Sequence, residues 1–150
     1  MTNYKKLKNE LELILSDSDE CITTLSNASA ILNSNIDNIN WVGFYLYKGG
    51  SLYLGPFQGL PACTRISLDK GVCGYCAYNR ETIVVDNVHE FKGHIACDSR
   101  SNSEICVPIV INDNLFGLLD IDSIEYSRFN LNDKEELIEV VEIIKNKLSI

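Results

Sequence analysis

Two cysteines in this sequence, Cys63 and Cys97, lie in segments that do not suit a packing residue. Cys63 is part of GPFQGLPACTR, which is rich in turn-forming residues, and Cys97 is part of the polar stretch GHIACDSRSNSEI. Cysteine is usually buried as a small hydrophobe, and exposed free thiols are disfavoured. Two loop thiols indicate reversible redox chemistry, in which one becomes a sulfenic acid and the other resolves it as a disulfide. The alternative is two unrelated surface thiols.

Three carboxylates are predicted to meet at one end of a sheet. Asp120 and Asp122, in LLDIDS, are two residues apart, so they point to the same face of a strand. A hairpin that turns at 112–114 pairs residues whose numbers sum to about 226, which places Glu104 beside Asp122. Such a group favours an amine, a divalent metal or shared protons, whereas acidic residues at a solvated strand end would need none of these.

A zinc site is an alternative use of the cysteines. Cys73 and Cys76 form a CxxC pair, and His94 and Cys97 form an HxxC pair, which together offer thiol and imidazole ligands. The pattern is weak because the CxxC pair lies in a predicted helix opening and no second CxxC follows, so no metal is expected. Plain packing suits Cys76 better, and Cys106, in the apolar run ICVPIVI, is expected to be a core residue. Neither histidine is assigned a catalytic role, because a loop histidine more often hydrogen-bonds the backbone.

The composition suits a globular protein. The chain has 150 residues, 45% hydrophobic and 23% charged, with a net charge of −8. This charge argues against a nucleic-acid partner, because no basic stripe is left to neutralise phosphates. The N-terminus MTNYKKLKNELELIL lacks a signal-peptide core, and no stretch has the length of a membrane span, so a cytoplasmic protein is expected.

Hydrophobic spacing predicts four helices. Residues 4–16 and 19–33 form the first two, GVCGYCAYN forms a short third, and the fourth ends the chain. Asn132 is expected to cap the fourth helix, with Glu135 three residues on. The stripes expected to face the core are Tyr4, Leu7, Leu11 and Ile14, then Cys21, Leu25, Ala28 and Leu32, and finally Leu137, Val141, Ile144 and Leu148.

Two β-hairpins and two short strands complete the predicted elements. The hairpins are WVGFYLYKGGSLYLGPF and EICVPIVINDNLFGLLDIDS, and Pro108 makes its strand an edge or a bulged one. In the first hairpin, alternation places Trp41, Gly43, Tyr45 and Tyr47 on one face and Val42, Phe44 and Leu46 on the other. The short strands are 64–68 and 82–86, and the long loop 87–103 is expected to be functional.

This order of elements predicts an α+β fold. We expect one domain over residues 1–150, with an antiparallel sheet of five or six strands and the N- and C-terminal helices packed on one side.

Five segments carry a resemblance to a known family. NWVGFYLY, GPFQGLPACTRI, GVCG, GHIACDSRSNSEI and LLDIDS closely resemble the free methionine-(R)-sulfoxide reductases, enzymes built on a GAF-type domain. The likeness runs from about residue 40 to 130, and Cys63, Cys73 and Cys97 stand at the family's spacings of 10 and 24.

The resemblance implies a GAF-like fold and reduction of free L-methionine-(R)-sulfoxide, without a cofactor. A cysteine sulfenic acid and an intramolecular disulfide recycled by thioredoxin would carry the reaction, in a homodimer. The implied roles are Cys97 as nucleophile, Cys63 as resolving cysteine, Cys73 as an auxiliary thiol, Trp41 and Tyr45 as the wall around the substrate methyl group, and Glu104, Asp120 and Asp122 as the substrate-binding carboxylates. Position does not divide the roles of the carboxylates; we favour Glu104 and Asp122 near the sulfoxide oxygen and Asp120 near the ammonium.

Three residues depart from the family pattern. Cys76 stands where a small or apolar residue is expected, Cys106 where a branched apolar residue is usual, and Leu60 replaces a polar residue. A GAF-type sensor that binds a small molecule without turnover is the main alternative. A pure binder would not need the pair of Cys63 and Cys97, which favours the enzyme.

Overall fold

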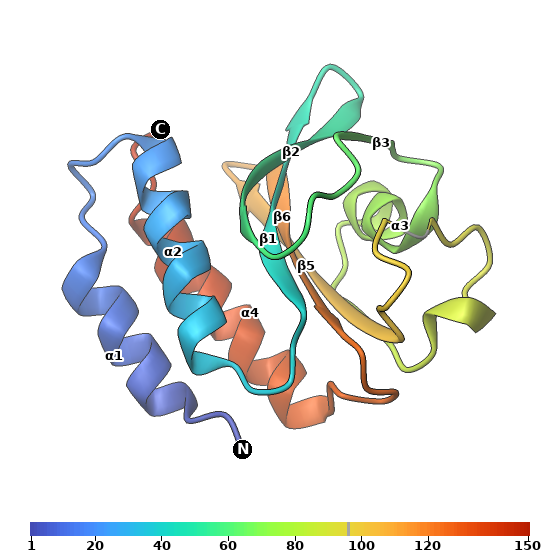
Figure 1. Cartoon of the computed structure of the whole chain (residues 1–150). Coiled ribbons are helices and arrows are strands. Elements are labelled where there is room, and N and C mark those ends of the chain that lie inside the picture. Colours follow the sequence, from blue (N-terminus) through green and yellow to red (C-terminus); the bar gives the residue numbers. More distant parts are fainter. Residues whose placement is uncertain (96) are drawn as a thin grey trace.

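The fold is an antiparallel sheet covered by helices on both faces (Figure 1). The computed structural model describes residues 1–95 and 97–150, and over these residues the sheet has six strands in the order β3-β2-β1-β6-β5-β4. The elements are α1 Tyr4–Ile14, α2 Cys21–Asn35, β1 Trp41–Lys48, β2 Ser51–Gln58, β3 Arg65–Ser67, α3 Gly71–Asn79, β4 Ile83–Val85, the 3-10 helix η1 Val88–Glu90, β5 Ser103–Ile111, β6 Asn114–Ser123 and α4 Leu131–Asn146. The predicted α+β class, with the terminal helices on one side, is confirmed. Residue 96, in the predicted 87–103 loop, lies outside the described residues.

The terminal helices α1, α2 and α4 build the larger core against one face of the sheet (Figure 1). Their predicted stripes are buried with two exceptions. Ile14 is 49% exposed, because α1 ends there and the extended backbone of Leu15 carries the next apolar side chain inward instead. Cys21 is half-buried at the edge of this core rather than inside it.

The start of α4 differs from the prediction by two residues. Asn130, not Asn132, is the N-cap: its side chain accepts from the backbone N–H of Asp133, and the Asp133 side chain accepts from the backbone N–H of Asn130. This reciprocal pair satisfies two backbone donors that a helix start leaves free. Asn132 is an exposed residue within the first turn.

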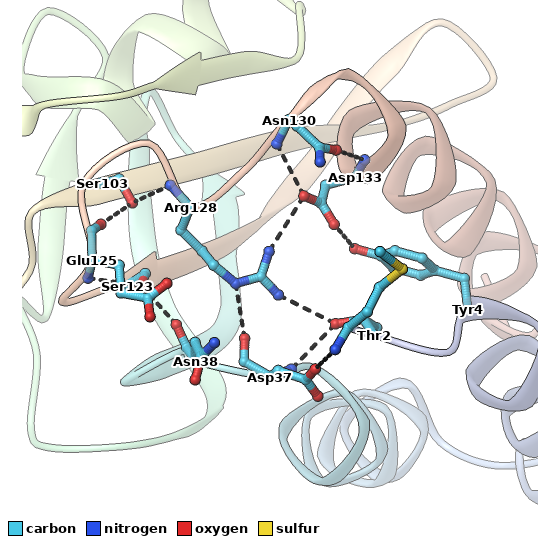
Figure 2. Close-up of polar contacts among 11 residues, drawn as sticks. Thr2, Tyr4, Asp37, Asn38, Ser103, Ser123, Glu125, Arg128, Asn130 and Asp133 are labelled. Atoms are coloured by element: carbon cyan, nitrogen blue, oxygen red, sulfur yellow. Dashed lines mark hydrogen bonds and ion pairs between the residues drawn. The ribbon is translucent and has the colours of Figure 1, made fainter.

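A polar network fastens this cap to the N-terminal segment (Figure 2). The Arg128 guanidinium donates to the Asp133 carboxylate at 3.3 Å and to the Asp37 carbonyl at 2.9 Å. It also donates to the Thr2 hydroxyl at 3.2 Å, and the Tyr4 hydroxyl donates to Asp133 at 2.6 Å. The network therefore joins the N-terminal segment to the start of α4.

The opposite face of the sheet carries α3 and a smaller core. Trp41 and Tyr45 of β1 belong to this core, whereas Val42, Phe44 and Leu46 pack under the terminal helices, so the predicted alternation is confirmed. None of the helices in residues 1–95 and 97–150 is long and apolar enough to cross a bilayer.

Both predicted hairpins form, and the second has the predicted register. Glu104 pairs with Asp122, as the index sum requires, and the turn lies at Asn112-Asp113. The pairing of β5 with β4 ends at Cys106, two residues before Pro108. Pro108 therefore lies where β5 has no β4 partner, and its lack of a backbone N–H costs no hydrogen bond to β4. A register shift follows between Ile109 and Val110, which confirms the predicted irregularity.

Candidate active site

A pocket lies between α3, the ends of β1, β5 and β6, and the loop that carries Cys97. The predicted site residues that line it are Trp41, Tyr45, Cys73, Cys97, Glu104, Asp120 and Asp122. The remaining one, Cys63, does not line the pocket but is bonded to Cys97. The fold therefore brings all the predicted site residues together from six separate segments.

The three carboxylates form the polar side of the pocket. Neighbouring strands place Trp41, Asp122 and Glu104 in one row across the sheet, and Gly43, Asp120 and Cys106 in the next. Glu104 is 7% exposed and Asp120 is 5% exposed. Burial of this degree excludes the reading of a solvated strand end, in which the charges would be hydrated.

Burial changes the protonation of these carboxylates. The pKa of Glu104 lies well above its usual value because of burial and then because of the negative charges of Asp120 and Asp122. Burial is also the main cause of the raised pKa values of Asp122 and Asp120. Hydrogen bonds from Glu104 and from the thiols of Cys106 and Cys73 counteract the shift at Asp120. Asp120 is thus the member best suited to stay ionised, and Glu104 and Asp122 are suited to retain protons.

Aromatic side chains form the apolar wall. Trp41 stacks on Tyr45 with ring centroids 6.0 Å apart, and on Phe57 at 5.3 Å. Phe57 can approach because β1 has a glycine opposite it: a Cβ on Gly43 would lie 2.3 Å from the Phe57 Cβ. The polar ends of the wall hold the neighbouring loop, since Trp41 Nε1 donates to the Leu60 carbonyl and the Tyr45 hydroxyl donates to the Cys63 carbonyl.

A disulfide between Cys63 and Cys97 joins two loops, with Cα atoms 5.4 Å apart. The segment after Cys97 is held by Asp98, which accepts from Asn40 Nδ2 at 3.0 Å and from the Arg100 guanidinium at 2.9 Å. The hydrogen bond from Arg100 lowers the pKa of Asp98 to about 2. This pairing of two polar loops is the arrangement that reversible thiol chemistry requires.

Comparisons with known proteins agree with this geometry. Residues 17–145 match the GAF domain family. The chain is 40% identical over 146 residues to the free methionine-R-sulfoxide reductase of Escherichia coli, covering 97% of this chain and 88% of that protein. The chain belongs to the free methionine-(R)-sulfoxide reductase family.

Two solved structures extend this similarity to three dimensions. The reduced form of fRMsr of Staphylococcus aureus superimposes with a TM-score of 0.95 at 53% identity, covering 99% of this chain and 96% of that one. Free methionine-R-sulfoxide reductase from Neisseria meningitidis, in complex with its substrate, superimposes with a TM-score of 0.89 at 36% identity, covering 96% and 87%. The GAF-like fold expected of this reductase family is confirmed.

This member of the reductase family has a thiol at the carboxylates that the sequence interpretation assigned to packing. Cys106 is fully buried, as expected, but its Sγ lies 3.2 Å from Asp120 Oδ1 and 3.5 Å from Glu104 Oε2. It also lies 3.5 Å from Cys73 Sγ. The signal was available in the sequence, because Cys106 follows Glu104 by two residues and therefore shares its strand face.

Other residues of the pocket and its surroundings were also missed by the sequence interpretation. Phe57 completes the aromatic wall, and Asn40 and Asp98 position the Cys97 segment. The sequence does contain a local signal for Asp98, because it directly follows Cys97 and Arg100 lies two residues after it. Neither sequence pattern nor periodicity indicates Phe57, because it reaches Trp41 only through the gap at Gly43.

Residues that could hold a metal ion form a different set from the one that the sequence suggested. Within the described residues, the candidate atoms come from Cys73, Glu104, Cys106 and Asp120, and all lie within 4.8 Å of one another. Two thiols and two carboxylates are a set that zinc accepts. The CxxC and HxxC combination does not supply such a set, because the sulfur of Cys97 is bonded to Cys63.

Proposed function

We propose that this protein reduces free L-methionine-(R)-sulfoxide to methionine, with Cys97 as the nucleophile and Cys63 as the resolving cysteine. The observation that carries the proposal is the disulfide between these residues beside a pocket that also holds three carboxylates and an aromatic wall. The similarity to the Escherichia coli reductase and to the Neisseria meningitidis reductase with its substrate supports it.

In the first step, the Cys97 thiolate attacks the sulfoxide sulfur while a protonated carboxyl group donates to the sulfoxide oxygen. Glu104 and Asp122 are the proposed donors, because their raised pKa values favour the protonated form. The attack forms a bond between Cys97 Sγ and the substrate sulfur. This bond and the S–O bond of the substrate then break as the hydroxyl group transfers to Cys97 Sγ, which releases methionine and leaves a Cys97 sulfenic acid. Methionine sulfoxide is thereby reduced by two electrons to methionine, and the cysteine is oxidised by two.

In the second step, the thiol of Cys63 attacks the Sγ of the sulfenic acid. An S–S bond forms and the hydroxyl group leaves as water after it takes up the proton from Cys63. The disulfide in the structure corresponds to the product of this step. A dithiol reductant then returns both cysteines to thiols, with its own oxidation to a disulfide.

The pocket suits a free amino acid. An ionised Asp120 pairs with the α-ammonium group, and the ring faces of Trp41 and Tyr45 enclose the methyl group bonded to sulfur. A methionine sulfoxide inside a polypeptide has an amide in place of the ammonium and leaves the buried Asp120 without its counter-charge. This loss of pairing selects against the protein-bound residue.

The remaining features follow from the family resemblance. Thioredoxin serves as the dithiol reductant, residues 1–150 act as one GAF-type domain, and two chains form a homodimer. A reducing compartment such as the cytoplasm is required, because the Cys63–Cys97 disulfide must be reduced after each turnover.

The decisive test is turnover of racemic free methionine sulfoxide with dithiothreitol, followed by separation of the two epimers. We expect the R epimer to be consumed and the S epimer to remain. N-acetylmethionine sulfoxide, which lacks the ammonium, is the control substrate and should react far more slowly. Binding of the sulfoxide without formation of methionine would support the sensor instead, and stoichiometric zinc in the purified protein would support a metal module.

A further inference from the structure

A second pair of thiols lies behind the Cys63–Cys97 disulfide. Cys73, on α3, and Cys106, on β5, are both buried and free, and their Sγ atoms are 3.5 Å apart. A disulfide requires an S–S distance of about 2.05 Å, so the two sulfur atoms need to approach by only about 1.5 Å. Rotation of two side chains that already face each other across α3 and β5 can supply this movement.

This inner pair has a route to the outer one. Cys73 and Cys97 line the same pocket. Once methionine leaves, the pocket that both cysteines line is free of substrate. We propose that Cys73 and Cys106 form a second redox couple that returns the Cys63–Cys97 disulfide to two thiols by internal exchange. The inference rests on the proposed function, because turnover creates the outer disulfide.

The exchange takes place in two balanced steps. The thiolate of Cys73 attacks Cys97 Sγ, the Cys63–Cys97 bond breaks, and Cys63 leaves as a thiolate that takes up the proton lost by Cys73. The thiol of Cys106 then attacks Cys73 Sγ, and Cys97 leaves as a thiolate with the proton from Cys106. The result is a Cys73–Cys106 disulfide and two reduced active-site thiols. Two electrons move from the inner pair to the outer pair, and no external oxidant or reductant is needed.

The surroundings of Cys73 make this exchange slower than the first resolution. The hydrogen bond with Cys106 lowers the pKa of Cys73, but burial and the charges of Asp120 and Asp122 outweigh it and raise the pKa to about 12. Little thiolate is therefore present at neutral pH. The outer disulfide forms first, and the inner pair acts afterwards as a reserve of reducing equivalents.

Cys76 is the competing partner to be separated from Cys106. It is fully buried three residues after Cys73 on α3, and its thiol also faces Cys106. The Sγ atom of Cys73 lies 3.5 Å from that of Cys106, however, and we therefore assign the second disulfide to Cys73 and Cys106.

The experiment counts methionine formed by fully reduced enzyme after the reductant is removed under anaerobic conditions. Excess racemic methionine sulfoxide is added, and we expect about two methionines per chain, the second more slowly than the first. Cys106→Val should give about one, and Cys76→Ala, the matched control on the same thiol cluster, should give about two. A wild-type yield of one, or a yield of two from Cys106→Val, overturns the proposal. Cys106→Ala repeats the test if the larger valine disturbs folding.

Peptide mapping makes the outcome independent of turnover. After reaction with either methionine sulfoxide or the thiol oxidant diamide, digestion without reduction should release a peptide pair that joins Cys73 to Cys106. If no variant forms methionine, the proposed function fails, and the diamide map alone decides the inner couple. A bridge between Cys73 and Cys76 in place of the expected one would contradict it.

Discussion

Glu104 and Asp122 stand directly opposite each other on β5 and β6, in a site largely removed from solvent. Two carboxyl groups in this position cannot both ionise without a free-energy penalty, so the folded protein binds protons that the unfolded chain releases. The same relationship supplies protonated carboxyl groups for the sulfoxide oxygen and weakens the fold at neutral pH.

The first prediction concerns the dependence of stability on pH. The pKa values of Glu104 and Asp122 are raised in the folded protein. The stability that these two carboxyl groups contribute is therefore complete below the unfolded carboxyl pKa of about 4, and it is lost as the pH rises through their folded-state pKa values. The free energy of unfolding in urea should therefore be lower at about pH 8 than at about pH 5. Glu104→Gln should reduce this difference, whereas Glu81→Gln, at an exposed position, should leave it unchanged. Equal pH dependence in wild type and Glu104→Gln would contradict the assignment.

The second prediction separates nucleophile from resolving thiol. Cys97→Ser should lower turnover at least about a thousandfold with either dithiothreitol or thioredoxin, because no sulfenic acid can form. Cys63→Ser should keep most of its activity with dithiothreitol, which can reduce the sulfenic acid directly, and lose activity with thioredoxin. Cys21→Ser, on the distant α2 helix, is the control. Equal losses with both reductants in Cys63→Ser would remove its resolving role.

The third prediction divides the roles of the carboxylates by steady-state kinetics. Asp120→Asn removes a charge-assisted hydrogen bond to the ammonium, which is worth about 1.5–3 kcal/mol, so KM should rise about 10- to 100-fold. Glu104→Gln, its neighbour, should mainly lower kcat because it can no longer donate the proton. An unchanged KM in Asp120→Asn would place the ammonium elsewhere.

The fourth prediction uses the single tryptophan of the chain, Trp41, as a reporter. Gly43→Ala would place a Cβ 2.3 Å from the Phe57 Cβ, so Phe57 must shift from its stacked position on Trp41. We expect altered Trp41 emission and a kcat/KM about tenfold lower, since wall residues that move by about 1 Å disturb substrate positioning. Gly55→Ala, on the same hairpin with its nearest neighbour 3.1 Å away, should have a smaller effect on the emission. Unchanged emission in Gly43→Ala would mean that Phe57 does not depend on this gap.

The fifth prediction tests the network around Arg128. Its side chain is 10% exposed and pairs with Asp133, which is 8% exposed. Arg128→Ala leaves the Asp133 carboxylate buried without its cation and should lower the free energy of unfolding by about 3–5 kcal/mol in urea. Lys5→Ala also removes one positive charge, but from an exposed position on α1, and should change stability by less than about 0.5 kcal/mol. A loss of similar size in both variants would indicate a general charge effect.

Local sequence patterns were sufficient for the elements and for much of the site. Alternation along β1 placed Trp41 and Tyr45 on one face, and the turn at residues 112–114 was enough to pair Glu104 with Asp122. These predictions succeed because side-chain period and hairpin register depend on residues close together in the chain. The polarity around Cys63 and Cys97 indicated thiol chemistry for the same reason, since it is a property of each loop alone.

The tertiary structure decided burial and partners. Whether Asp120 is solvated or buried depends on α3 and the Cys97 loop, which cover the sheet from distant parts of the sequence. The same covering turns Cys106 from an apparent packing residue into a thiol 3.5 Å from Cys73. Likewise, the tertiary structure gives Asp133 of the α4 capping box two further partners, Arg128 and Tyr4, which no local pattern indicates. Periodicity assigns a side chain to a face of the sheet, but its pKa, its bonding partners and its chemistry depend on what the rest of the chain packs against that face.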